Sequence, residues 1–289
     1  MGETLKAYIS ILKLRIGVAV AVSALAGLAV TPGDKPVGWH VVLLGLAVLL
    51  SAASAGAFNH FYERDLDIRM ARTKGRPFAS GKFQAGWPWL LAIMGLLVFS
   101  VGLAWVVANG VAAIFVFLGA FVYGVIYTVW LKRRSVWNIV IGGLSGSFAV
   151  LAGAAAVDPG LPIQALILAL VLFLWTPPHF WSLASALKDD YAAAGVPMLP
   201  VVMDERRTNY IILANTIALV AASLLPGFFG AGPLYMAGAG LSGAWFIWKS
   251  IELVRHPGRQ AAMGNFFASL IQLVVVLAAA SVDSLLLQG

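Results

Sequence analysis

The sequence predicts an all-α polytopic membrane protein, a bundle of nine transmembrane helices, and three observations support this fold class. Apolar residues make up 61% of the 289 residues and charged residues only 11%, whereas soluble domains contain about 25% charged residues. The apolar residues form long runs, and a membrane helix needs about 20 of them. The connections between the runs alternate along the chain between short, almost uncharged ones and longer ones rich in Lys and Arg. This composition excludes a water-soluble globule and a disordered protein.

The nine apolar runs are bounded by charged residues, Pro or Gly. Each is long enough to span a membrane as a helix, and none alternates like a barrel strand. They cover residues 8–30, 39–59, 87–107, 111–130, 136–157, 162–183, 207–229, 232–250 and 265–287. The first run follows Lys6 and Lys13 as in a secretory signal peptide. Because every later run is also a span, we expect it to be retained as a signal anchor, within a single transmembrane domain covering residues 1–289.

The connections between the runs predict how the chain crosses the membrane. Those at residues 31–33, 109–110, 158–160 and 230–232 are short and almost uncharged. Of the 19 Lys and Arg residues, Lys35 is the only one on the side of these short connections. The positive-inside rule therefore places the other side, with the N-terminus, in the cytoplasm. An odd number of spans then places Asp283 outside.

The net charge of +7 and the absence of cysteine limit the function further. The basic residues lie beside the spans rather than along a polar face, so we expect no nucleic-acid partner. A chain without cysteine has no disulfide, thiolate metal site or thiol nucleophile. Basic loops set topology and attract anionic lipid. Two cytoplasmic loops also contain acidic residues, which a topology signal does not need.

The first of these loops, residues 59–82, contains three acidic and six basic side chains. If the second helix continues through it, Asn59, Glu63 and Asp67 are spaced by four residues and form one stripe. Asp65 would point to another face and is a weaker candidate. Carboxylate and amide oxygens without His or Cys suit Mg²⁺, which completes its coordination with water and phosphate.

Basic residues that follow the stripe could bind such a phosphate. Arg72 and Arg76 offer bidentate hydrogen bonds, and Lys74 offers a point charge. The alternative is a solvent-exposed helix end held together by Glu–Arg pairs. The stripe favours the metal and phosphate interpretation.

The second loop, residues 175–202, begins at the end of the sixth span. Pro177 and Pro178 are expected to kink or interrupt the helix there. On an unbroken helix His179 and Asp190, eleven residues apart, would share a face, with Asp189 beside Asp190. Taken alone, His179 is better explained as a hydrogen-bonded core histidine, and the aspartate pair as a solvated loop.

Two acidic clusters at one membrane face, both next to apolar helices, favour a common explanation. A diphosphate could be bridged by Mg²⁺ between the clusters while its apolar tail lies in the bundle, which describes a polyprenyl diphosphate. The metal would neutralise the departing diphosphate. The apolar and aromatic walls would keep water away from an allylic cation.

Several motifs carry a resemblance that covers nearly the whole chain. They are Asn59-x-x-x-Glu63-x-Asp65-x-Asp67, Arg72-Thr73, Arg76-Pro77, Tyr127-Thr128-x-x-Leu131-Lys132-Arg133, residues 138–143, residues 175–181 and residues 190–200. With them the chain resembles the UbiA-type intramembrane prenyltransferases. The first motif marks the superfamily, and the later ones are similar to the branch that farnesylates protohaem IX.

The resemblance implies Mg²⁺-dependent transfer of farnesyl from farnesyl diphosphate to a vinyl group of protohaem IX (haem b), with capture of water. The product, haem o, would serve a terminal oxidase. The catalytic residues implied are Asn59, Glu63, Asp67 and His179. The implied Mg²⁺ ligands are Asn59, Glu63, Asp67, Asp189 and Asp190. The implied substrate-binding residues are Arg72, Lys74, Arg76, Lys132, Tyr127, Trp175, Trp181, Asp190 and Tyr191.

The resemblance also implies a setting for this chemistry. The enzyme would lie in a bacterial cytoplasmic (inner) membrane with its active site facing the cytoplasm. Besides membrane lipid, its partners would include a haem-delivery protein or haem a synthase. His179, with Trp175 and Trp181 near it, would face the porphyrin, either to ligate iron, to move a proton or only to pack.

Two departures from the family pattern leave alternatives open. Glu63 stands where Asp is usual, which lengthens the side chain by one methylene. Residues 147–150 stand where a Pro-Pro pair is expected, so a UbiA-type transferase for a quinone precursor or another acceptor is the second hypothesis. A transporter would place ionisable groups near the membrane midplane, and this chain places its acids at one face.

Overall fold

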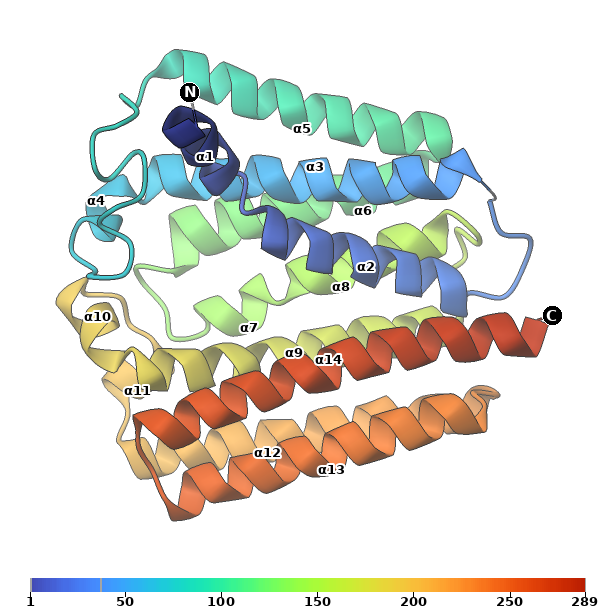
Figure 1. Cartoon of the computed structure of the whole chain (residues 1–289). Helices are drawn as coiled ribbons and strands as arrows, with labels where there is room; N and C mark the ends of the chain where they lie inside the picture. Colours follow the sequence, from blue (N-terminus) through green and yellow to red (C-terminus); the bar gives the residue numbers. More distant parts are fainter. Residues whose placement is uncertain (1, 37, 289) are drawn as a thin grey trace.

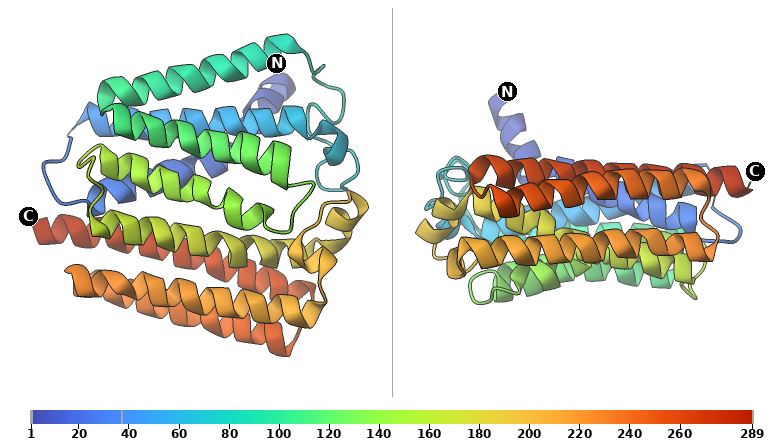
Figure 2. Two further views of the ribbon diagram at one scale, coloured as in Figure 1. Left: turned by 180° about the vertical axis from the view of Figure 1, so that it is seen from behind. Right: turned by 90° about the horizontal axis from the view of Figure 1, so that it is seen from below.

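The computed structural model describes residues 2–36 and 38–288, and leaves Met1, Val37 and Gly289 outside the described residues. Within these residues every regular element is helical, and the long helices lie side by side in a bundle (Figure 1). Views from behind and from below show the same arrangement (Figure 2). The first half of the bundle contains α1 (Gly2–Ile11), α2 (Leu14–Val30), α3 (Trp39–Tyr62), α4 (Arg64–Asp67), α5 (Trp87–Val107), α6 (Gly110–Phe121), the π-helix η1 (Val122–Leu131), α7 (Asn138–Gly142) and α8 (Leu144–Ala155). The second half contains α9 (Ile163–Ala186), α10 (Lys188–Ala193), α11 (Leu199–Val202), α12 (Glu205–Leu224), the 3₁₀ helix η2 (Leu225–Phe229), α13 (Pro233–Arg255) and α14 (Arg259–Gln288).

The helices give an all-helical membrane protein with seven or eight candidate spans. Seven helices within the described residues are long and apolar enough to cross a membrane, and the bent pair formed by α1 and α2 would be an eighth. The expected span at residues 232–250 falls on α13, which has 23 residues but does not meet the same test of apolarity. Its last turns carry Lys249, Glu252 and Arg255.

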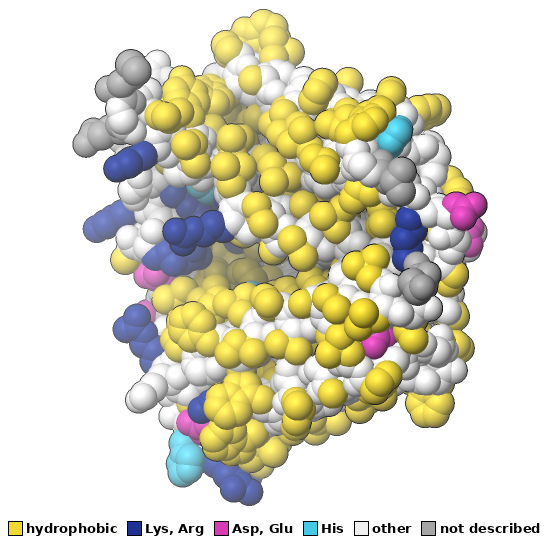
Figure 3. All heavy atoms as spheres, turned by 45° about the vertical axis from the view of Figure 1, so that its right-hand side comes forward, with side chains coloured by type: hydrophobic (Ala, Val, Ile, Leu, Met, Phe, Trp, Pro, Cys, Tyr) yellow, Lys and Arg dark blue, Asp and Glu magenta, His cyan; other side chains and the backbone are white. Residues whose placement is uncertain are grey.

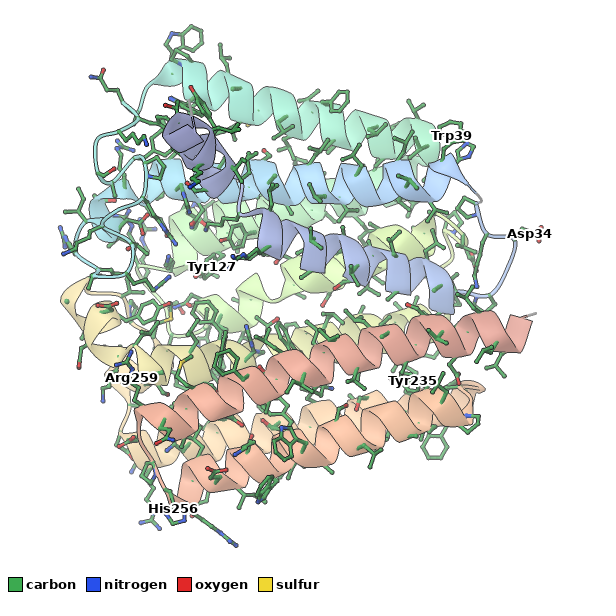
Figure 4. The ribbon with its side chains drawn as sticks, viewed as in Figure 1. Asp34, Trp39, Tyr127, Tyr235, His256 and Arg259 are labelled. Carbon is green, nitrogen blue, oxygen red and sulfur yellow. The ribbon has the colours of Figure 1, made fainter. Side chains whose placement is uncertain are left out.

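The two ends of the bundle differ in composition. The short helices α4, α10 and α11 lie together at one end, where Figure 4 also places His256 and Arg259. Asp34, Trp39 and Tyr235 lie toward the opposite end (Figure 4). On the face in Figure 3, most Lys and Arg side chains gather at the edge on the side of α4 and α10, while hydrophobic side chains cover the flank.

Two glycines allow α2 and α8 to cross at close range. A Cβ atom at Gly27 would collide with the carbonyl oxygen of Val150, and one at Gly153 would collide with that of Ala24. Helix pairs in membranes commonly use small residues in this way, because close backbone approach maximises van der Waals contact. The contact holds one wall of the N-terminal half of the bundle in place.

The structure shows where the sixth span is continuous and where it breaks. Pro177 and Pro178 do not interrupt α9, which continues to Ala186. Proline can remain in a membrane helix when neighbouring helices surround it, and α9 packs against α8, α12 and α14. The break comes instead at Leu187, with φ −120° and ψ 29°. His179 and Asp190 therefore do not lie on one continuous helix.

Candidate active site

The polar stripe lies at the junction of α3 and α4. Although α3 ends at Tyr62, the amide of Glu63 donates to the Asn59 carbonyl (2.9 Å), and the amide of Asp67 donates to the Glu63 carbonyl (2.8 Å). The helical spacing is kept, so Asn59, Glu63 and Asp67 share one face. They are only 2%, 0% and 2% exposed.

Asp65 points away from this face, as its position in the turn predicted. Both of its carboxylate oxygens accept 2.7 Å hydrogen bonds from Arg133 at the surface. These hydrogen bonds lower the pKa of Asp65 and raise the pKa of Arg133. Asp65 is therefore held outside the buried cluster.

The buried carboxylates are neutralised by basic side chains from two later segments. Glu63 forms an ion pair with Lys132, which follows η1. Arg76 donates from Nη1 to both oxygens of Asp67 at 2.9 Å. A buried charge without a partner is strongly destabilising, so each of the two buried carboxylates has a basic partner close to it.

Lys13 belongs to this cluster, although from the sequence we considered it only as part of a basic start resembling a signal peptide. Its Nζ donates to Asn59 Oδ1 (2.6 Å) and to the Tyr123 hydroxyl (3.1 Å). The amide nitrogen of Asn59 donates to Thr128 Oγ1 at 3.0 Å. Lys13 has a left-handed backbone, φ 47° and ψ 42°, at the break between α1 and α2. No sequence signal distinguishes it from the other basic residues at the N-terminus.

The π-helix η1 brings the remaining cluster residues together. The Lys132 amide donates to the Tyr127 carbonyl (2.9 Å), and Thr128 Oγ1 donates to the Tyr123 carbonyl (2.8 Å), both across five residues. The rings of Tyr123 and Tyr127 stack with centroids 5.5 Å apart. π-helical segments occur frequently at functional sites. The sequence predicted only a regular helix here.

The second loop contacts the first through Asp190 and Tyr191. Asp190 Oδ1 accepts from the Ala71 amide (3.4 Å), and Arg72 donates to the Tyr191 hydroxyl (3.3 Å). Burial raises the pKa of Tyr191, against the opposing effect of the Arg72 charge. Asp189 and Lys74 are exposed. The two loops therefore meet through Asp190 and Tyr191, and not through Asp189.

The acidic residues are not assembled into a ready-made metal site. Among residues 2–36 and 38–288, no three His, Asp or Glu side chains are grouped closely enough to hold a metal ion. One feature nevertheless fits a cation: Glu63 Oε1 is buried and has no hydrogen-bond partner. The donor set consists of carboxylate and amide oxygens, which hard divalent cations prefer.

His179 lies on α9 between two aromatic rings. Its imidazole stacks on Trp175 at a centroid distance of 4.1 Å and on Phe266 at 4.6 Å. His179 Nδ1 is 2.7 Å from Ser269 Oγ. Trp181 is not beside it: two residues further along a helix is roughly 200° of rotation, and Trp181 packs in a buried cluster that also contains Tyr127.

An apolar cavity of about 130 Å³ extends from the cluster into the bundle. Lys13 and Tyr123 line it, and the rest of its lining is mainly small and apolar, with Ala52, Val116 and Ala149 among the wall residues. The arrangement suits an amphipathic ligand with an anionic head and an apolar tail.

Residues 147–150, which depart from the family pattern, belong to α8. Ser147 is buried and donates to the Ala169 carbonyl at 2.8 Å. Ala149 lines the apolar cavity, and Val150 is the residue that Gly27 approaches. This segment therefore shapes the cavity wall and the crossing of α2 and α8.

Comparisons with known proteins identify relatives of the whole chain. The chain is 66% identical to protoheme IX farnesyltransferase 2 of Paramagnetospirillum magneticum (strain AMB-1) over 286 residues, 99% of both chains. It is 49% identical to protoheme IX farnesyltransferase 1 of the same organism, over 97% of this chain and 99% of that one.

Solved structures share the fold at low sequence identity. A digeranylgeranylglyceryl phosphate synthase structure matches with a TM-score of 0.79 and 19% identity, over 98% of this chain and 99% of that chain. A UbiA homologue from Archaeoglobus fulgidus bound to DMAPP and Mg²⁺ matches with a TM-score of 0.71 and 15% identity, over 95% and 99%. The model of the UbiA prenyltransferase family matches residues 20–271. With its helical bundle and buried polar cluster, the chain belongs to the UbiA prenyltransferase family.

Proposed function

We propose that this enzyme transfers the farnesyl group of farnesyl diphosphate to a vinyl group of protohaem IX, with capture of water, and so makes haem o. The observation that carries the proposal is 66% identity, over 99% of both lengths, to a protoheme IX farnesyltransferase. The polar cluster at the mouth of an apolar cavity supplies matching geometry for the donor. Residues 1–289 act as a single prenyltransferase domain.

The donor head binds at the buried polar cluster. Lys13, Arg76 and Lys132 supply positive charge around the carboxylates of Glu63 and Asp67. Arg72 and Lys74, nearer the surface, contact diphosphate oxygens or the haem propionates. The farnesyl chain extends along the cavity past Val116 and Ala149.

Asn59, Glu63, Asp67 and Asp190 would hold Mg²⁺ together with the diphosphate. The partnerless Oε1 of Glu63 supports this assignment, as does the fold-related UbiA homologue bound to DMAPP and Mg²⁺. When bound, the metal neutralises charge on the leaving diphosphate. Asp189 is exposed and joins only through a rearrangement of α10.

The reaction follows from these groups. The bond between farnesyl C1 and oxygen breaks, and the diphosphate leaves with the electron pair, stabilised by Lys13, Arg76 and Lys132. Tyr123 and Tyr127 present aromatic rings toward the developing allylic cation, an interaction that favours cations. The vinyl π electrons form the new carbon–carbon bond, and water adds to the resulting cation and loses a proton.

The protein acts within a membrane, and the proposal includes the number of spans and the orientation of the chain. All nine predicted runs cross it, α13 included, with the N-terminus and the two motif loops in the cytoplasm. The charge asymmetry supports this orientation through the positive-inside rule. The membrane is the bacterial inner membrane, where a haem-delivery protein or haem a synthase would exchange haem with this enzyme.

Mass spectrometry of haem extracted from membranes supplied with haem b, farnesyl diphosphate and Mg²⁺ tests the function. We expect a mass increase of one farnesyl group plus water that disappears with EDTA. Unchanged haem in a folded preparation would reject haem as the acceptor. Because Ala149 in the departing segment lines the cavity, quinone precursors would then be tested with the same donor.

A further inference from the structure

We propose that Nε2 of His179 is an axial ligand to the iron of the acceptor haem, an assignment that rests on the proposed function. Three structural observations carry it: the tautomer of the imidazole, the covering of its two faces, and its position relative to the polar cluster. Together they favour ligation through Nε2 over packing alone.

The hydrogen bonds around Ser269 determine the tautomer. Ser269 Oγ donates its one hydrogen to the Phe266 carbonyl at 2.6 Å. It can therefore only accept in the 2.7 Å contact with His179 Nδ1. The Nδ1 atom carries the proton, so Nε2 of the neutral ring has a free lone pair. Metal-ligating histidines are typically oriented in this way, by donating from the other ring nitrogen.

The aromatic neighbours leave only the edge of the imidazole available. Trp175 and Phe266 both stack on His179, at interplanar angles of 20° and 27°. The indole nitrogen of Trp175 in turn donates to the Ser269 carbonyl at 2.8 Å, which fixes this ring. A porphyrin cannot stack on an imidazole whose faces are covered, but its iron can approach Nε2 along the ring plane.

Consecutive contacts connect His179 to the polar cluster. The Lys132 ammonium, paired with Glu63, lies 5.7 Å from the centre of the Tyr127 ring. The Tyr127 ring packs closely against Gly142, and Thr176 packs closely against Gly143. A Cβ atom added to either glycine would lie within 3.0 Å of that side chain. Thr176 precedes His179 by one turn of α9.

A haem anchored at His179 would therefore lie in the same end of the bundle as the donor cluster. Figure 3 shows the protein surface hollowed next to a group of Lys and Arg side chains. With iron fixed at the centre of the porphyrin, one vinyl edge can point toward the donor.

Haem titration of the purified full-length protein, without farnesyl diphosphate or Mg²⁺, tests the ligand. Optical spectra and electron paramagnetic resonance should show a nitrogen-ligated haem, and the ferrous nitrosyl form should show hyperfine splitting from a trans nitrogen. In His179→Gly these signatures should be lost, and free imidazole, which fits between Trp175 and Phe266, should restore them. Imidazole rescue would not occur if His179 only packed.

Two further variants make the test specific. His256→Ala changes an exposed histidine in the connection between α13 and α14 and should leave the spectra unchanged. Ser269→Ala keeps the backbone acceptor of Trp175 but removes the acceptor of Nδ1, and should weaken haem binding about 10-fold. Loss of the signatures in His60→Gln but not in His179→Gly would overturn the assignment, as would identical spectra of the wild type and His179→Gly.

Product analysis by mass spectrometry separates this inference from the proposed function. If nitrogen ligation depends on His179 but no farnesyl transfer occurs, the proposed function is rejected and His179 is still supported as the iron ligand. If the wild-type protein transfers farnesyl although its haem has no nitrogen ligand, the proposed function is supported and His179 is rejected as the iron ligand.

Discussion

Each acidic residue of the first motif has a different environment, although they follow one another closely in sequence. Glu63 and Asp67 are buried and paired with Lys132 and Arg76, whereas Asp65 is exposed and paired with Arg133. The buried pair lies next to the apolar cavity through Lys13 and Asn59. Chemically similar substitutions at these positions should therefore have very different effects.

We expect Asp67→Asn and Asp190→Asn to raise the Mg²⁺ concentration needed for half-maximal transfer and to lower turnover at ordinary Mg²⁺ by about 100-fold, since each removes charge beside the leaving group. Asp65→Asn is the matched control and should stay within a few-fold of wild type. Farnesyl transfer measured across a Mg²⁺ titration provides the comparison. Equal, normal rates in all three variants would remove these carboxylates from the metal site.

Thr128 orients Asn59, because its hydroxyl accepts from the Asn59 amide while donating to the Tyr123 carbonyl. Thr128→Val keeps the shape but leaves the buried amide group without a partner, so we expect transfer to fall about 10-fold. Thr128→Ser retains the hydroxyl and should restore most of the rate. Steady-state kinetics of the two variants should separate them, and a Thr128→Val enzyme as active as Thr128→Ser would contradict this role.

The exposed Asp65–Arg133 pair makes a small, pH-dependent contribution to stability. Because hydrogen bonding to Arg133 lowers the pKa of Asp65, the stabilisation is present above the ordinary aspartate pKa of about 4. It is lost as the pH falls through the lowered value. Thermal unfolding should show Asp65→Asn less stable than wild type near pH 6, by less than about 1 kcal/mol, with the difference shrinking under acidic conditions. A difference that grows on acidification would contradict the sign.

Among the elements, the long apolar helices were the most predictable, because each consists of a run that only a membrane or a core can accommodate. Residues 87–107 form α5 with those same bounds. The π-helix, the break at Leu187 and the continuity of α9 through Pro177 and Pro178 were not predictable. They depend on neighbouring helices rather than on local sequence. For the same reason the sequence does not reveal Lys13 and Thr128 as cluster residues. They reach Asn59 only because α2 and η1 pack against α3.

The crossing of α2 and α8 should tolerate no side chain at Gly153. A methyl group there would collide with the Ala24 carbonyl, and overpacking of this kind costs about 1–3 kcal/mol. Gly146→Ala on the same helix is the control, because its Cβ would lie 4.0 Å from Leu172 Cδ1. It should be neutral or slightly stabilising. Thermal unfolding in detergent checks both, and equal stability of the two variants would contradict the close contact.

At the scale of the whole molecule, the absence of cysteine makes the membrane orientation directly testable. Two exposed positions suit single cysteines: Asp34 lies in the connection between α2 and α3, and Lys188 is the first residue of α10, at the opposite end of the bundle (Figures 1 and 4). In intact cells a membrane-impermeant maleimide should label Asp34→Cys, whereas Lys188→Cys should be labelled only after permeabilisation. The reverse pattern would invert the proposed orientation, and labelling of both in intact cells would reject it.

The ion pairs of the buried cluster have a consequence for how the enzyme is loaded. At the proposed site, free Mg²⁺ would have to displace Lys132 and Arg76 from Glu63 and Asp67, and a free diphosphate would have to attract the same two cations away from them. When metal and diphosphate arrive together, the displaced cations find phosphate oxygens and the carboxylates find the metal. The two ligands should therefore tighten each other's binding by the same factor. An enzyme so arranged would stay closed to stray divalent ions and release the spent diphosphate together with its metal.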